Sequence, residues 1–148
     1  MSQQRVPESP VPFLHLFPVQ LRFNDVDMLG HVNNNVYLQL FDAAKYDYFR
    51  SVMGEGFDIR RLALVVVNIN CDFYEPSYLD EPLQVMTATE RIGDKSITLL
   101  QRIVNVHNAH VKCQCRTVMA AFDPHTLTSA SVDADSRAKL EAFENRSF

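Results

Sequence analysis

Apolar residues recur along this chain with two spacings, and the wider one predicts a helix that starts near residue 34. The residues that repeat every three or four positions are Val36, Tyr37, Leu40, Phe41, Ala44 and Tyr48. This period is typical of an amphipathic α-helix with a wide buried face. Asn33 or Asn34 can cap its start by accepting a hydrogen bond from an unpaired amide of the first turn. Gly54 and Gly56 are expected to end it.

The narrower spacing predicts five β-strands. They are expected at residues 16–24, within RLALVVVNINCDFYEP up to Pro76, and at residues 83–91, 96–106 and 111–122. The second strand should place Val65 and Ile69 on one face, because side chains alternate along a strand. Asn68 and Asp72 should lie on its other face.

Two turns and a final helix complete the pattern. Residues 92–95, Ile-Gly-Asp-Lys, predict a hairpin turn, and a second turn is expected near Asn108. In the last strand, Val111, Cys113 and Cys115 alternate with the polar residues Lys112, Gln114 and Arg116. Asp133 can cap a short C-terminal helix that extends through Phe143.

The order of these elements predicts an α+β fold with a curved antiparallel five-stranded sheet. One long helix and five strands can share a core only if the sheet curls around that helix. The length of 148 residues suits one domain that buries a continuous core without disulfide or metal support. We expect a flexible, proline-rich N-terminal tail at residues 1–14 and a single domain at residues 15–148.

Composition and charge exclude several classes of protein. The formal net charge is −4, and no cluster of Lys and Arg is present to neutralise phosphates, which argues against a general nucleic-acid binder. No run approaches the roughly 18 apolar residues that span a bilayer. The N-terminal stretch MSQQRVPESPVP lacks the apolar segment of a secretion signal. We expect a soluble, cytoplasmic protein.

Three cysteines raise the question of a disulfide or a metal site. Cys113 and Cys115 lie too near each other along an extended strand for an ordinary bridge, and free thiols in a reducing cytoplasm are the simpler interpretation for these two and Cys71. His107 and His110 precede this pair, but the spacing matches neither CxxC pairs nor HExxH, so no metal is expected. A cysteine or serine nucleophile is also disfavoured, since no thiol follows a helix start and no GxSxG motif occurs.

The polar residues before the long helix carry the candidate chemistry. DVDMLGHVNNNVYL, residues 25–38, gathers two acids, a histidine and three asparagines at the helix start. Free amides and the positive dipole end of a helix stabilise the negative charge that a carbonyl oxygen gains under attack. A carboxylate nearby can accept a proton from water or attack the carbonyl itself.

This stretch, together with VVVNINCDFYEP and the element order, resembles the hotdog-fold acyl-CoA thioesterases, in the branch named for 4-hydroxybenzoyl-CoA thioesterase. The similarity covers roughly residues 15–125 and looks closest to bacterial long-chain acyl-CoA thioesterases. It implies a hotdog fold and hydrolysis of an acyl-CoA to free acid and coenzyme A. It also implies a homodimer or homotetramer, because the family's active site combines the helix end of one subunit with strands of a second.

By position, the resemblance assigns three catalytic residues. Asp27 matches the family's acid, which acts as general base or as nucleophile. Asn34 matches the position whose backbone N–H polarises the carbonyl, and His31 matches a recurrent histidine whose role can be structural or catalytic. From the residues alone, Asp27 could instead cap or brace the loop, and Asp25 is expected to be structural.

Further substrate contacts are expected from Asn33, Tyr37, Asn68, Arg91 and Lys95. Lys95 lies in the hairpin where relatives place basic residues against the phosphates of coenzyme A, and Arg91 is a second candidate. A solvated turn lysine is the alternative for Lys95, since exposed lysines are common. No cofactor is expected, because coenzyme A is part of the substrate.

Two other functions are compatible with the same architecture. One is a non-catalytic hotdog protein that binds acyl thioesters or lipids, and the other is a hotdog hydratase or dehydratase. Asp27 beside the helix start favours hydrolysis. Binding without release of thiol would favour the first alternative, and an enoyl or hydroxyacyl product would favour the second.

Overall fold

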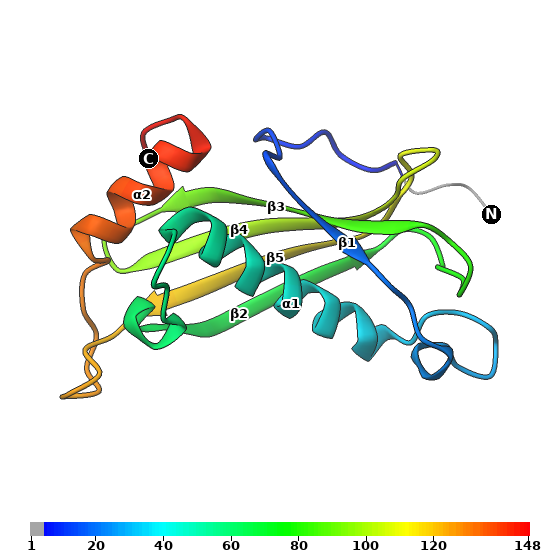
Figure 1. The fold of residues 1–148 in the computed structure, drawn as a ribbon, viewed down its shortest axis with the longest axis horizontal. Coiled ribbons are helices and arrows are strands. Elements are labelled where there is room, and N and C mark those ends of the chain that lie inside the picture. Colours follow the sequence, from blue (N-terminus) through cyan, green and yellow to red (C-terminus); the bar gives the residue numbers. More distant parts are fainter. Residues whose placement is uncertain (1–4) are drawn as a thin grey trace.

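A curved antiparallel sheet of five strands lies against one long helix in the computed structural model, which describes residues 5–148 (Figure 1). The strands are β1 (His15–Val19), β2 (Leu64–Phe73), β3 (Leu83–Ile92), β4 (Ser96–Asn105) and β5 (Val111–Ala121). Their order across the sheet is β1-β3-β4-β5-β2, so β1 and β2 are its two edges. The predicted fold class is confirmed.

The long helix α1 (Asn34–Met53) supplies one side of the core. Its buried residues are Val36, Tyr37, Phe41, Ala44, Tyr48 and Phe49. They include all of the predicted apolar stripe except Leu40, which is half-buried. They pack against inward-facing residues of the sheet such as Val85, Leu99 and Ile103. The helix ends as predicted at Gly54, whose φ of 83° is a conformation that glycine adopts without a steric penalty.

The short C-terminal helix α2 (Ala134–Glu144) is also confirmed. The Asp133 side chain caps it by accepting a hydrogen bond from the Ser136 N–H at 3.0 Å. Leu140 is fully buried and packs beside Tyr48 and Phe49, which fastens α2 to α1 at one end of the sheet (Figure 1). Two single 3-10 turns, η1 (Phe23–Asp25) and η2 (Ile59–Leu62), precede α1 and β2.

The first strand is shorter than predicted. β1 was expected to reach residue 24, but it ends at Val19. The Asp25 carboxylate accepts a hydrogen bond from the Arg22 N–H at 2.7 Å, and the Asp25 N–H donates to the Arg22 carbonyl at 2.9 Å. These local bonds fold residues 23–25 into η1, and they compete with an extended strand for the same backbone groups.

The predicted faces of β2 are correct from Asn68 onward, after a bulge at Val67. Val66 lies opposite Met119 of β5 and Asn68 opposite Val118, so Val67 is an extra residue in β2. An extra residue reverses the alternation of side chains on either side of it. Val65 and Ile69, which were expected on one face, therefore lie on opposite faces of the sheet.

The N-terminal segment crosses the sheet face that is turned away from α1. Val11 is buried against Ala88 and Leu100, and the Arg102 side chain donates to the Pro7 carbonyl at 2.6 Å. The first four residues of the predicted tail lie outside the described residues. None of the helices within residues 5–148 is long and apolar enough to cross a membrane.

Candidate active site

A groove of about 410 Å³ opens beside the N-terminal end of α1, and we refer to it as the α1 groove. Its lining residues are Asp27, Leu29, His31, Val32, Asn34, Tyr37, Phe73, Tyr74, Glu75 and Pro76. They come from the loop before α1, from the first turns of α1, and from the end of β2 with the start of its connection to β3. The groove thus brings together four of the predicted site residues: Asp27, His31, Asn34 and Tyr37.

The Asp27 loop, residues 26–33, holds the predicted catalytic acid by one of its two oxygens. Asp27 Oδ1 accepts hydrogen bonds from the N–H groups of Leu29 at 2.9 Å and His31 at 3.3 Å. The Asp27 N–H donates to the His31 carbonyl at 2.8 Å, and Gly30 at a φ of 78° permits this tight turn. Asp27 Oδ2 makes no hydrogen bond within residues 5–148, so one carboxylate oxygen is free while the other fixes the side chain.

The start of α1 leaves one amide unpaired in the same groove. The Asn33 side chain accepts a hydrogen bond from the Asn35 N–H at 2.9 Å, which confirms the predicted cap. The Val36 N–H donates to the Asn33 carbonyl at 2.9 Å. The Asn34 N–H has no acceptor in the described part of the chain. It is a donor at the positive end of the helix dipole, where an anionic oxygen is stabilised.

The connection between β2 and β3, residues 74–82, lies against the Asp27 loop. The Val32 N–H donates to the Ser77 carbonyl at 2.8 Å, and His31 forms an isolated β-bridge with Tyr78. The rings of His31 and Tyr78 meet edge to face, with their centroids 5.2 Å apart. The imidazole makes no hydrogen bond within residues 5–148, so packing against Tyr78 is what orients it.

Tyr37 forms an apolar surface of the groove and is anchored at its hydroxyl. The hydroxyl donates to Ser77 Oγ at 2.8 Å, and the ring packs edge to face on Phe73 with centroids 5.4 Å apart. Burial raises the pKa of the Tyr37 phenol above its usual value, so the hydroxyl stays protonated at neutral pH. The side chain is therefore suited to packing against an acyl group rather than to proton transfer.

Asp25 has the structural role that was expected of it. Its buried carboxylate accepts hydrogen bonds from the Arg22 side chain at 3.0 Å and from the Arg22 N–H. The bond from the Arg22 side chain lowers the pKa of Asp25 below its usual value. The Asp25 carbonyl in turn accepts the Asn33 N–H at 2.8 Å, which joins η1 to the helix cap.

Comparison with known families decides the relationship. Residues 21–140 match the model of the thioesterase-like superfamily. The chain belongs to this superfamily. It is 27% identical to the long-chain acyl-CoA thioesterase FadM of Escherichia coli K12, over 83% of this chain and 94% of the relative. It is 26% identical to the acyl-CoA thioester hydrolase YbgC of Escherichia coli O6:H1, over 75% of this chain and 84% of that protein.

Solved structures of thioesterases share the fold. A thioesterase from Thermus thermophilus, solved with coenzyme A and zinc, superposes with a TM-score of 0.82 and 24% identity, covering 92% of this chain and 98% of that one. A predicted thioesterase from Bacillus stearothermophilus superposes with a TM-score of 0.78 and 24% identity, covering 90% and 98%. The resemblance to hotdog thioesterases that the sequence indicates is confirmed.

Four predicted substrate contacts of this thioesterase-family chain are not among the residues that line the α1 groove. Asn33 is next to it, as the cap of α1. The other three lie farther away. Asn68 stands opposite Val118, on the sheet face away from α1. Arg91 is exposed near the end of β3, and Lys95 is exposed in the β3–β4 hairpin, where its carbonyl accepts the Ala121 N–H at 2.9 Å. Their role in binding stays a prediction, and within one chain they do not border the predicted catalytic residues.

The cysteines lie in the core rather than in the groove. All three are free thiols, and burial raises the pKa of Cys113 above its usual value and that of Cys115 to about 12. Thiols with raised pKa values are poor nucleophiles at neutral pH. Within residues 5–148, no group of three or more His, Cys, Asp or Glu side chains is arranged to hold a metal ion.

One wall of the groove was not predicted from the sequence. Phe73, Tyr74, Glu75 and Pro76 lie opposite the Asp27 loop, although more than forty positions separate Asp27 from Phe73 along the chain. Pro76 marks the end of β2 in the sequence, but no spacing rule relates it to residues 27–34. This juxtaposition arises from the sheet, which carries the end of β2 past the start of α1.

Proposed function

We propose that this chain hydrolyses acyl-CoA thioesters to a free acid and coenzyme A, with Asp27 acting on the thioester and the Asn34 N–H polarising its carbonyl. One observation carries the proposal: the free Oδ2 of Asp27 and the unpaired Asn34 N–H belong to residues of the same groove. Membership of the thioesterase-like superfamily and similarity to FadM, a long-chain acyl-CoA thioesterase, support this substrate class.

Hydrolysis needs two groups at the thioester carbonyl: a carboxylate that acts at its carbon and an N–H that donates to its oxygen. With Asp27 as general base, Oδ2 takes a proton from water as the water oxygen attacks the carbonyl carbon. With Asp27 as nucleophile, the carboxylate forms an acyl anhydride that water then hydrolyses. In either case negative charge grows on the carbonyl oxygen, the Asn34 N–H donates to it, and the C–S bond breaks to release coenzyme A as a thiolate that takes up a proton.

A second copy of the chain would complete the site. β2 is an edge strand whose residues Val65, Val66, Val67, Ile69 and Phe73 are 40% to 60% exposed. An apolar edge of this length presents unpaired backbone groups and is a strong surface for strand pairing. Phe73 lies both on this edge and in the α1 groove. We therefore propose a homodimer or homotetramer in which the partner borders the groove.

The oligomer is tested by light scattering after size-exclusion chromatography. We expect a mass that is two or four times 16.9 kDa for the wild type. Val67→Lys, which puts a charge on the β2 edge, should lower this mass. Leu127→Lys is the matched control, because Leu127 is also exposed but lies outside the strands. A wild-type mass of 16.9 kDa would contradict the proposal.

The activity is tested by thiol release from a series of acyl-CoAs that differ in chain length and aromaticity. The three thiols of the protein are subtracted when a thiol reagent reports release. Asp27→Asn should lower kcat by at least about 100-fold, because it removes the base or nucleophile. The Asp27→Asn fold should persist, since the Asn oxygen can still accept the N–H groups of Leu29 and His31.

The outcomes of this assay separate the possible functions. Full activity in Asp27→Asn would remove Asp27 from the mechanism. Binding of acyl-CoA without any thiol release would identify a binding protein, and an enoyl or hydroxyacyl product would identify a hydratase or dehydratase. We place the reaction in the cytoplasm, where a reducing environment keeps the three cysteines as free thiols.

A further inference from the structure

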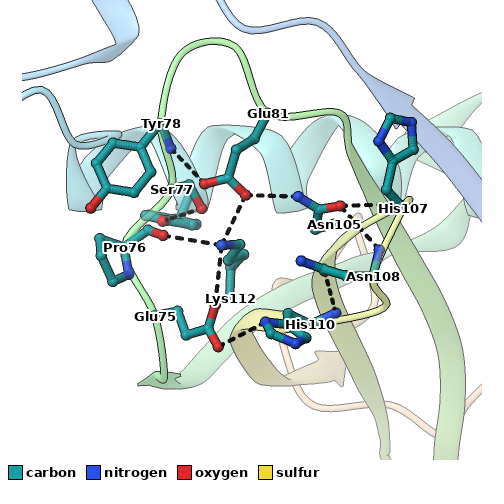
Figure 2. A network of polar contacts seen from close by, with 11 residues as sticks. Glu75, Pro76, Ser77, Tyr78, Glu81, Asn105, His107, Asn108, His110 and Lys112 are labelled. Carbon is teal, nitrogen blue, oxygen red and sulfur yellow. Dashed lines mark hydrogen bonds and ion pairs between the residues drawn. The ribbon is translucent and has the colours of Figure 1, made fainter. Parts of the chain in front are cut away.

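A bulge in β5 turns one lysine toward the wall of the α1 groove. Ile103 of β4 lies opposite Cys113 and Val104 lies opposite Val111, so Lys112 has no opposite residue on β4. Bulges redirect side chains and are common beside functional sites. Lys112 is 5% exposed, and its side chain lies among the polar groups of the β2–β3 connection (Figure 2).

Lys112 binds all three groove residues that follow β2. Its Nζ lies 3.2 Å from Glu75 Oε2 and donates to the Pro76 carbonyl at 3.3 Å. Its own carbonyl accepts the N–H groups of Tyr74 at 2.9 Å and Glu75 at 3.3 Å. Tyr74, Glu75 and Pro76 are therefore attached to one residue of β5, partly through its backbone and partly through its ammonium group.

Glu81 anchors the far end of the same connection. Its carboxylate lies 2.9 Å from Lys112 Nζ and accepts the Tyr78 N–H at 3.1 Å and the Asn105 side-chain amide at 2.9 Å (Figure 2). Burial alone would raise the pKa of Glu81, but the hydrogen bonds from Lys112, Asn105 and the Tyr78 N–H, together with the positive charge of Lys112, leave this pKa below its usual value. The ammonium and the carboxylate are thus both charged at neutral pH, and each stabilises the other.

The connection that Lys112 binds, residues 74–82, is also the segment that pairs with the Asp27 loop. Ser77 accepts hydrogen bonds from the Val32 N–H and from the Tyr37 hydroxyl, and Tyr78 pairs with His31. Lys112 itself does not line the groove. Its hydrogen bonds and ion pairs connect it to the groove through residues 74–82.

We propose that Lys112 is a positioning residue. Its ammonium group fixes the β2–β3 connection, so that Asp27 and the Asn34 N–H both reach the same thioester carbonyl. The inference rests on the thioesterase function proposed above. A displacement of about 1 Å in a positioning element can lower the rate of a reaction about 100-fold. Loss of the ammonium group should therefore reduce turnover more than substrate binding.

The test compares two lysine variants with a matched arginine variant on the same strand. Lys112→Met keeps the long apolar stem and removes the charge, and Lys112→Arg keeps a cation. Arg116→Met is the control, because the Arg116 side chain binds Glu90 of β3 through two bonds of 2.8 and 3.0 Å rather than the β2–β3 connection. All variants are assayed at a temperature at which circular dichroism shows them fully folded.

We expect Lys112→Met to lower kcat by about 10- to 100-fold with KM for acyl-CoA changed by less than about threefold. Lys112→Arg should recover at least half of the lost rate, and Arg116→Met should keep the wild-type kcat. A wild-type kcat in Lys112→Met, or an equal loss in Arg116→Met, would overturn the proposal.

Amide hydrogen exchange gives a second readout that does not depend on activity. The Val32 N–H reports directly on the contact between the two segments, since it donates to Ser77 at 2.8 Å. It should exchange at least about tenfold faster in Lys112→Met than in the wild type or Arg116→Met. Equal exchange would overturn the positioning role. If the wild type releases no thiol, the proposed function fails, and this exchange rate alone still decides whether Lys112 holds the loop.

Discussion

Two polar clusters, one toward each end of α1, use similar groups for different purposes. At the N-terminal end, Lys112 joins Glu75 and Glu81 beside the α1 groove. In the second cluster, farther along α1, the Tyr48 hydroxyl lies 2.6 Å from Glu144 Oε1 and 2.7 Å from Thr89 Oγ1.

The clusters differ in what they join. The Lys112 cluster holds a connection, and that connection supports a loop in which Asp27 Oδ2 stays free. The Tyr48 cluster joins three regular elements, because Tyr48 comes from α1, Thr89 from β3 and Glu144 from α2, and none of the three lines the groove. We therefore expect the Lys112 cluster to serve activity and the Tyr48 cluster to serve stability, and substitutions should separate the two effects.

The largest effect is expected from Asn34→Pro. Proline is favoured at the first position of a helix, and the extended Asn33 before it is compatible with a following proline. The variant should therefore fold. It lacks the Asn34 N–H, which is the one amide of residues 33–36 without an acceptor in the described part of the chain. Loss of a donor to the carbonyl oxygen should lower kcat by about 100- to 1,000-fold.

Asn34→Ala is the control for this substitution, because it keeps the backbone N–H and changes only the side chain. We expect its kcat to stay near the wild-type value. Steady-state thiol release measures both variants, and thermal unfolding verifies that both are folded. A strong loss of activity in Asn34→Ala would assign the role to the side chain instead of the amide.

The next effect, on stability, is expected from Tyr48→Phe. Removing the hydroxyl leaves Glu144 Oε1 with the Thr89 N–H as its remaining hydrogen-bond donor, at 2.8 Å. The cost should be about 1–3 kcal/mol of unfolding free energy, measured in urea, with kcat unchanged. Tyr46→Phe is the matched control, because Tyr46 is partly exposed on the same helix. A large fall in kcat with little loss of stability would show that the Tyr48 cluster also serves the reaction.

The difference between local and distant contacts explains how much of this could be predicted. α1, its Asn33 cap and its end at Gly54 are encoded within a few residues, so spacing and residue type predict them. The position of Lys112 depends on a bulge in the β4–β5 register, and the wall at Phe73–Pro76 depends on where β2 passes α1. Such features need the whole sheet, and they were absent from the sequence-based prediction of the site.

The ionisation of Glu81 in the Lys112 cluster predicts a smaller, pH-dependent effect on stability. Burial acts to raise the pKa of Glu81, but the hydrogen bonds from Lys112, Asn105 and the Tyr78 N–H and the charge of Lys112 act against it, so the net pKa is below the usual value. A lowered pKa in the folded state contributes stability that is present above the usual value of 4.5 and is lost as pH falls through the folded value. The Tyr48 phenol, whose pKa burial raises, stays neutral in this range.

Urea unfolding between about pH 3 and pH 6 tests the contribution of Glu81. The unfolding free energy of the wild type should decrease toward low pH, and Glu81→Gln should decrease less steeply. Some slope will remain in the variant, because Asp25, Asp58 and Asp123 also have lowered pKa values. Equal slopes in the two proteins would show that the Glu81 charge adds nothing to stability.

The smallest effect is expected outside both clusters, at Lys95 in the β3–β4 hairpin. If Lys95 contacts a phosphate of coenzyme A, the gain is one exposed ion pair, which is worth about 0.2–1 kcal/mol. Lys95→Ala should then raise KM for acyl-CoA by about 1.4- to fivefold without lowering kcat. KM for an acyl pantetheine thioester, which lacks the nucleotide, should stay constant. Lys139→Ala, an exposed lysine on α2, controls for the change in net charge, and equal effects on both substrates would assign Lys95 to the solvated surface.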